Sequence, residues 1–133
     1  GISNNISYLH TKLFLLTNSN FKTMPSFNSN TGSNITLTEA TAMTSAWATL
    51  QSTMSIPITI SNPKSMAYGK NKIQDILDQQ GCEGIRIYNG YSDSNRVMVI
   101  VGVDEDGNDM TGGNILEWGM PCPASCPPST AIG

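Results

Sequence analysis

Three cysteines and one histidine are the side chains best suited to chemistry in this 133-residue sequence. Cys122 and Cys126 lie four positions apart, so their thiols can reach one metal ion or form a small-loop disulfide. A tetrahedral zinc site needs four ligands, and only Cys82 and His10 remain as further nitrogen or sulfur donors. Three states therefore stay open: a disulfide within the tail or from Cys82 to the tail, free thiols, or a metal site on Cys82, Cys122 and Cys126.

Other patterns that resemble catalytic or metal sites have simpler structural explanations. Cys82 follows Gly81 at the expected end of a helix, whereas a catalytic thiolate needs a neighbouring base or a helix N-terminus. The acidic stretch 104–109 matches an EF-hand at three positions but lacks the required glycine and final glutamate, so we expect a turn with Gly107 at positive φ. The sequence indicates no catalytic residue and no cofactor, and it favours a protein that is not an enzyme.

Composition excludes two classes of partner. Charged residues make up only 13% of the chain and the net charge is −3, so the basic stripe typical of nucleic-acid-binding proteins is missing. The longest apolar run is a few residues, too short to span a bilayer. We therefore expect a small soluble protein of cytoplasmic type that binds neither nucleic acid nor membrane.

The chain divides into three parts by composition. Residues 1–35 are rich in Ser, Asn and Thr, whose side chains compete with regular backbone structure, and we expect a flexible arm. Met24 fits a native start, which would make residues 1–23 an extension. Residues 36–120 carry the periodic patterns of an α+β domain, and residues 121–133 form a tail rich in proline and cysteine.

Two helices are expected in the middle part. Thr36 and Glu39 fit a capping box, in which each side chain bonds to the backbone of the other residue. Apolar residues then recur at intervals of three and four up to Met54, which is typical of one helical face. A second helix is predicted over residues 70–80, with Gly81 as its left-handed cap.

A β-hairpin is the strongest strand signal. Residues 83–91 and 96–103 are rich in β-branched and aromatic side chains, and residues 92–95 between them are typical of a turn. A shorter third strand is predicted near residues 114–118. The whole pattern predicts an α+β fold with two helices packed on a small antiparallel sheet built around the hairpin at about 83–103.

The second strand of this hairpin is apolar on both faces. Val97, Val99, Val101 and Val103 share one face, while the other face carries Met98 and Ile100. Exposed apolar patches of this kind rarely persist on monomers. Either the arm, the link at residues 56–63, which we expect to be extended, or the tail covers the second face, or a second copy does so in a homodimer.

Arg86 and Tyr88 occupy alternate positions of the first strand, so they point from one sheet face. They are candidates for contacts with a partner, together with Val97, Val99 and Val101. The alternative is a local ion pair and ordinary packing.

The stretch GCEGIRIY at 81–88, the stretch VGVDEDGND at 101–109 and the CPxxC pattern at 122–126 resemble a small uncharacterised bacterial protein family. The resemblance covers about residues 36–127 and implies a small cytoplasmic-type protein of the same fold. It implies no substrate and no catalytic residue. Our first hypothesis is a non-enzymatic interaction or structural module that self-associates through its hairpin. The alternative is a cysteine-based module, either metal-holding or redox-linked.

Overall fold

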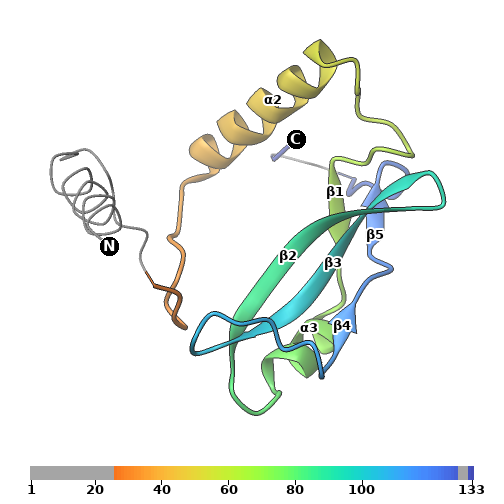
Figure 1. The fold of residues 1–133 in the computed structure, drawn as a ribbon. Coiled ribbons are helices and arrows are strands. Elements are labelled where there is room, and N and C mark those ends of the chain that lie inside the picture. Colours follow the sequence, from red (N-terminus) through yellow and green to blue (C-terminus); the bar gives the residue numbers. More distant parts are fainter. Residues whose placement is uncertain (1–25, 129–131) are drawn as a thin grey trace, which may run out of the picture.

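The computed structural model describes residues 26–128 and 132–133. These residues form a three-stranded antiparallel sheet, a separate two-stranded sheet and two helices, arranged as in Figure 1. The α+β class is therefore confirmed. The elements follow the chain in this order: α2 (Leu37–Thr53), β1 (Ser65–Ala67), α3 (Lys70–Leu77), β2 (Cys82–Ser92), β3 (Asn95–Asp104), β4 (Ile115–Leu116) and β5 (Met120–Cys122). In this part of the chain, no helix has the length and apolar character needed to cross a membrane.

The predicted hairpin is formed by β2 and β3. The regular register runs from Ser92 opposite Asn95 to Gly84 opposite Val103, and a bulge then precedes the last pair, Cys82 opposite Asp104. Asp93 and Ser94 form a two-residue turn with φ values of 49° and 64°, the left-handed conformation that matches the twist of hairpin strands. The turn is therefore confirmed where the run of polar residues predicted it.

The second edge of β3 is covered by several segments of the chain. The strand order of this sheet is β2-β3-β4, and only two residues of β3 pair with β4. The remaining outward groups find other partners: Arg96 N–H donates to Ser61 O at 2.8 Å, Tyr68 O–H to Met98 O at 2.7 Å, and Met110 N–H to Gly102 O at 2.8 Å. β3 is thus an interior strand over most of its length.

A second sheet joins two segments that the sequence left without strands. β1 pairs with β5, and Ser65 lies opposite Cys122. The link at 56–63, expected to be extended, contains no strand. The boundary expected between residues 120 and 121 falls inside β5, so the beginning of the tail is part of a sheet.

The buried apolar core is small and lies around β3. Its members come from α3, β3 and β5: Ile76, Ile100, Val101, Val103 and Cys122. α3 packs against β2 and β3, and Ile76 on its inner face is fully buried. The helix ends at Leu77, earlier than residue 80, and Gly81 takes the expected positive φ of 84°.

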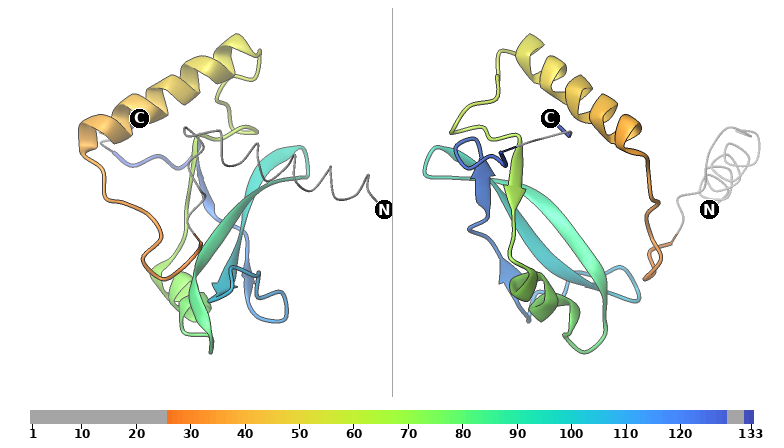
Figure 2. Two further views of the ribbon diagram at one scale, coloured as in Figure 1. Left: turned by 60° about the vertical axis from the view of Figure 1, so that its left-hand side comes forward. Right: turned by 180° about the vertical axis from the view of Figure 1, so that it is seen from behind.

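α2 stands away from the three-stranded sheet (Figures 1 and 2). Its N-terminus has the predicted capping box, since Glu39 N–H donates to Thr36 Oγ1 and Thr36 N–H donates to Glu39 Oε2. The helix makes no substantial contact with another helix or strand. The expected packing of helices on the sheet therefore holds for α3 and not for α2. Residues 54–64 connect α2 to β1. The apolar side chains of α2 and of its C-cap residue are 43–61% exposed: Leu37, Met43, Trp47, Leu50 and Met54.

Candidate functional site

The valine face of β3 is closed over part of its length by the chain itself. Val101 and Val103 are 4% and 1% exposed, while Val97 and Val99 are half-buried. Near the Val103 end, Phe27 covers the sheet so closely that a Cβ added at Gly84 would lie 2.8 Å from its Cζ. The segment before α2 thus supplies part of the cover, and Val101 offers almost no area to a partner.

Arg86 and Tyr88 lie on this valine face, opposite Val101 and Val99 in the register. Both side chains bind the carboxylate of Asp109. Arg86 forms an ion pair with its Oδ1, and the Tyr88 hydroxyl donates to its Oδ2 at 2.5 Å. The hydrogen bond to Asp109 is the main cause that raises the pKa of Tyr88 and of Arg86. The structure therefore contains the local ion pair that was the alternative to a contact with a partner.

Asp109 reaches these side chains because the loop after β3 folds back over the sheet. The Asp104 carboxylate accepts hydrogen bonds from the backbone N–H groups of Asp106 and Asn108, at 3.0 and 2.9 Å. Gly107 has the positive φ that the turn requires, 81°, and its carbonyl accepts a bond from Arg86 Nη2 at 3.1 Å. This is the predicted turn, with Asp104 used as an internal cap.

The outer edge of β2 is open. A two-residue turn makes Ser92 and Asn95 a hydrogen-bonded pair, so bonded and outward-pointing residues alternate from there along the strand. Gly84, Arg86, Tyr88 and Gly90 bond to β3. The four residues between and beyond them point their backbone N–H and C=O groups away from the sheet: Ile85, Ile87, Asn89 and Tyr91. No described residue forms a hydrogen bond with these backbone groups.

Apolar side chains flank this edge on both faces. Ile87 and Tyr91 are 55% and 76% exposed on the face of α3, and Tyr88 is 45% exposed on the valine face. Natural edge strands are commonly protected by lysine, proline or short length. β2 is 11 residues long and contains neither lysine nor proline. A bulge between Cys82 and Gly84 and the charged Glu83 lie at its first end, so the open stretch is limited to residues 85–91.

The cysteines divide into a bonded pair and a single thiol. Cys122 and Cys126 form a disulfide, and Cys82 is free. The Cys82 Sγ lies 3.2 Å from the carbonyl oxygen of Gly84 and sits against Gly102. In the described ranges, no group of three His, Cys, Asp or Glu side chains could hold a metal ion. His10 lies outside these ranges.

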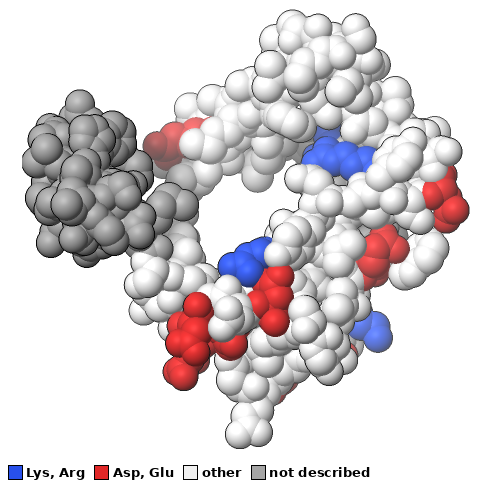
Figure 3. Space-filling model, viewed as in Figure 1, with Lys and Arg blue, Asp and Glu red and all other residues white. Residues whose placement is uncertain are grey.

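Figure 3 shows that the surface over α2 carries little charge and that the molecule is hollowed between this helix and the hairpin. Glu39 is the one charged residue of α2. In Figures 1 and 2, β2 lies on the outer side of β3, toward this space. Figure 3 also shows charged side chains of both signs on the hairpin side of the hollow, so the weakly charged surface is that of α2.

Sequence reasoning identified some of these groups and missed others. It placed Arg86 and Tyr88 on the valine face because alternation along a strand fixes the face. It missed Asp109 as their partner and the outer edge of β2 as an open surface. Finding either would have required knowledge that the loop folds back and that β4 joins β3 and not β2.

Comparison with known proteins gives no match to this chain among protein-family models, curated proteins or solved structures.

Proposed function

We propose that this chain is a non-enzymatic structural module that self-associates by pairing β2 of one copy with β2 of a second copy. The observation that carries the proposal is the open edge of β2, with its four residues whose backbone groups find no partner in the described chain. A strand edge of this kind is a template for adding a strand from another chain. The hairpin then continues across the two copies as one sheet.

A second copy fits this edge because antiparallel pairing of identical strands has two-fold symmetry. The register that uses all four outward residues sets Ile85 opposite Tyr91 and Ile87 opposite Asn89. The axis then passes between the two copies of Tyr88, which meet as a non-hydrogen-bonded pair with close side chains. Arg86 faces Gly90 of the second copy, so no like charges oppose each other between residues 85 and 91.

The apolar side chains beside the open edge also favour association. Ile87, Tyr88 and Tyr91 are 55%, 45% and 76% exposed, and pairing of two copies through β2 would remove part of this apolar surface from water.

Native mass spectrometry and sedimentation at tens of micromolar test the proposal. We expect a dimer for the parent chain, and a monomer for Ile87→Lys, since a charge beside an edge strand opposes pairing. The dissociation constant should rise at least about tenfold, equivalent to ~1.4 kcal/mol. Met120→Lys is the matched control, because Met120 is 59% exposed and lies on β5. A strictly monomeric parent chain would overturn the proposal.

Cross-linking tests the register. In a Cys82→Ser background, Tyr88→Cys should form a reducible covalent dimer on mild oxidation, because the two copies of residue 88 meet at the axis. Tyr91→Cys is the control, since this register sets residue 91 opposite residue 85. Equal cross-linking of both variants would rule out this register. Whether a dimer forms at all is decided separately by native mass spectrometry.

Bacterial origin and cytoplasmic location remain predictions. A disulfide persists in oxidising compartments and is rare in the cytosol. Alkylation of thiols in the source cells, followed by mass spectrometry of Cys122 and Cys126, tests the location. Reduced thiols fit the cytoplasm, and a disulfide in fresh lysate contradicts it.

A further inference from the structure

Trp118 is the most exposed large apolar residue of the described chain. Its side chain is 87% exposed, and its backbone has a φ of 65°, in the left-handed region that residues with a Cβ enter only at an energetic cost. It lies in the short connection between β4 and β5. Glycine would suit this backbone better, and the indole gains almost nothing from burial. The stability of the fold therefore does not account for a tryptophan at this position.

Trp118 lies at the edge of a cavity of about 500 Å³, which is within the usual range of ~300–1,000 Å³ for ligand sites. The cavity is bounded by α3, by β4 and by the chain between β1 and α3 (Figure 1). The fully buried Ile76 forms part of its wall. The Tyr68 ring forms another part and is held by the hydrogen bond from its hydroxyl to Met98 O at 2.7 Å. Because these walls belong to the folded core, the cavity is formed before any ligand arrives.

Three charged side chains line this cavity: Lys72 and Asp75 of α3, and Glu117 directly after β4. None of the three is in an ion pair with another described residue. The negative charge of Glu117 adds, after burial, to the raised pKa of Tyr68, so this carboxylate lies near the ring. Asn114 adds an amide, whose Nδ2 donates to the Asp75 carbonyl oxygen at 3.5 Å. The cavity therefore offers both donors and acceptors beside one exposed aromatic ring.

We propose that this cavity binds a neutral sugar ring, and that the ring packs against the indole of Trp118. Charges of both signs in the lining disfavour a simple ion, since Asp75 and Glu117 oppose an anion and Lys72 opposes a cation. A sugar is uncharged, and each of its hydroxyl groups both donates and accepts. It can therefore satisfy the ammonium group and the carboxylates together. The C–H groups on one face of the sugar ring are apolar and suit contact with the indole.

A second cavity indicates that the ligand is a chain of sugars. Glu117 and Trp118 also line this cavity of about 290 Å³, which reaches Asn95 and Arg96 at the turn of the hairpin. The indole thus lies between two cavities, and linked sugar rings can occupy both. Linkage holds the second ring at a high effective concentration, which tightens binding. No residue of the open edge at 85–91 lines either cavity, so this site does not depend on the proposed dimer.

Isothermal titration calorimetry on the full chain tests the proposal with four neutral hexasaccharides: cellohexaose, maltohexaose, mannohexaose and chitohexaose. We expect at least one to bind with a dissociation constant of about 1 mM or lower, and the corresponding single sugar to bind at least about tenfold more weakly. Ribonuclease B, which carries a neutral mannose glycan, is compared with the unglycosylated ribonuclease A. This pair distinguishes a protein-linked glycan from a free polysaccharide as the source of the sugar.

Trp118→Gly should bind the best hexasaccharide at least about tenfold more weakly, without a lower melting temperature, because glycine adopts a positive φ freely. A purely structural tryptophan would instead lower the melting temperature when it is removed. Trp47→Ala is the matched control and should bind like the parent, because this other tryptophan of the chain lines neither cavity.

Glu117→Gln keeps an acceptor oxygen and should retain most of the binding, whereas Glu117→Ala should lose it. Equal loss in both variants would mean that the site requires a negative charge, which contradicts a neutral ligand.

Three further results would overturn the inference. One is that none of the hexasaccharides and neither ribonuclease binds at concentrations of about 5 mM. Another is unchanged binding by Trp118→Gly. The third is tighter binding of choline or acetate than of every sugar, which would identify the cavity as a site for an ion.

Discussion

The hydroxyl of Tyr88 donates a hydrogen bond to Oδ2 of Asp109 at 2.5 Å, which ties the edge strand β2 to the loop beyond β3. The other oxygen of the same carboxylate is paired with Arg86. One acidic side chain thus holds two neighbouring groups of β2 against the valine face, above the buried Val101. Tyr88 is also the residue that the proposed dimer places on its axis, so Asp109 fixes the side chain around which two copies would meet.

Asp109→Asn should lower the pKa of Tyr88, because the hydrogen bond to the carboxylate is the main cause that raises it. A raised pKa in the folded state means that this bond stabilises the fold fully below the ordinary tyrosine pKa of about 10. That stability is lost as the pH rises through the folded value. An ultraviolet titration of tyrosinate, read as the difference between the parent and Tyr88→Phe, measures the pKa. Asp106→Asn is the control, and an unchanged titration in Asp109→Asn would contradict the assignment.

Thr36→Ala should destabilise α2 by about 1 kcal/mol, the usual cost of losing an N-cap hydroxyl. Helical circular dichroism over a temperature ramp measures it. The pKa of Glu39 is lowered, mainly by the hydrogen bond from the Thr36 backbone. This contribution is present above the ordinary glutamate pKa and is lost as the pH falls through the folded value. Thr49→Ala, at an exposed site within the helix, should raise helicity slightly. If Thr36→Ala and Thr49→Ala lost the same amount of helix stability, the loss of the N-cap would be excluded as the cause.

Ile76→Ala should reduce the free energy of unfolding by about 2–5 kcal/mol, because the side chain is fully buried and leaves a cavity. Leu77→Ala changes the next residue of the same helix, where 41% of the side chain is exposed, and should cost less than half as much. Denaturant unfolding of the two variants gives the comparison. Similar losses would mean that α3 is not anchored through Ile76.

Gly119→Ala should displace Tyr68 and reduce the free energy of unfolding by about 1–3 kcal/mol, the usual cost of overpacking. A Cβ at Gly119 would lie 2.6 Å from Cζ of the Tyr68 ring, and the ring is held by its hydrogen bond to Met98 O. Burial is the main cause that raises the pKa of Tyr68, so a displaced ring should also titrate at lower pH.

Gly112→Ala is the matched control for that substitution, because a Cβ at Gly112 would meet nothing within 4 Å. Thermal unfolding and the tyrosinate titration are read on both variants. A stable Gly119→Ala protein with an unchanged titration would mean that the ring moves aside without cost.

The features predicted correctly from the sequence are those fixed by neighbouring residues. The capping box needs only Thr36 and Glu39, and the hairpin needs two β-rich runs around a polar turn. Each of these features is determined within a few positions of the chain. Local chemistry therefore suffices to place the start of α2 and the turn between β2 and β3. The end of α3 was predicted too late: the helix ends at Leu77 with Asp78 as its C-cap, and Gly81, although it has positive φ, is not the cap.

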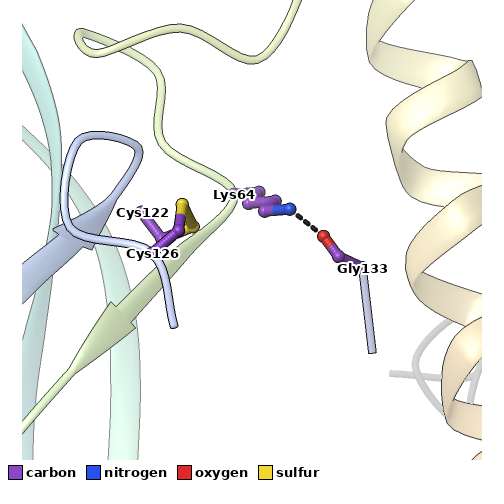
Figure 4. The surroundings of a disulfide bond; sticks show 4 residues. All are labelled: Lys64, Cys122, Cys126 and Gly133. Carbon is purple, nitrogen blue, oxygen red and sulfur yellow. Dashed lines mark hydrogen bonds between the residues drawn. A yellow bond between two sulfur atoms is a disulfide. The ribbon is translucent and has the colours of Figure 1, made fainter. Parts of the chain in front are cut away.

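The features missed depend on contacts between distant segments. β1 and β5 have three residues each, and β5 contains Pro121, so neither shows the alternation by which a strand is identified. The position of α2 was missed for a related reason. An amphipathic pattern predicts that the apolar face of a helix is buried, but it does not identify the segment that covers this face. The hydrogen bond from Lys64 Nζ to the carbonyl oxygen of Gly133 (Figure 4) also joins distant segments and has no signal in the sequence.

The apolar core draws its side chains from α3, β3 and β5, and none from α2. This separation implies two levels of opening in native-state hydrogen exchange. Amides of α2 should exchange through a local opening of low free energy, while amides of β3 near Val101 should exchange only when the whole domain unfolds. If α2 detaches without disturbing the rest, we expect it to be the segment that passes to a neighbouring copy in any domain swapping at high concentration.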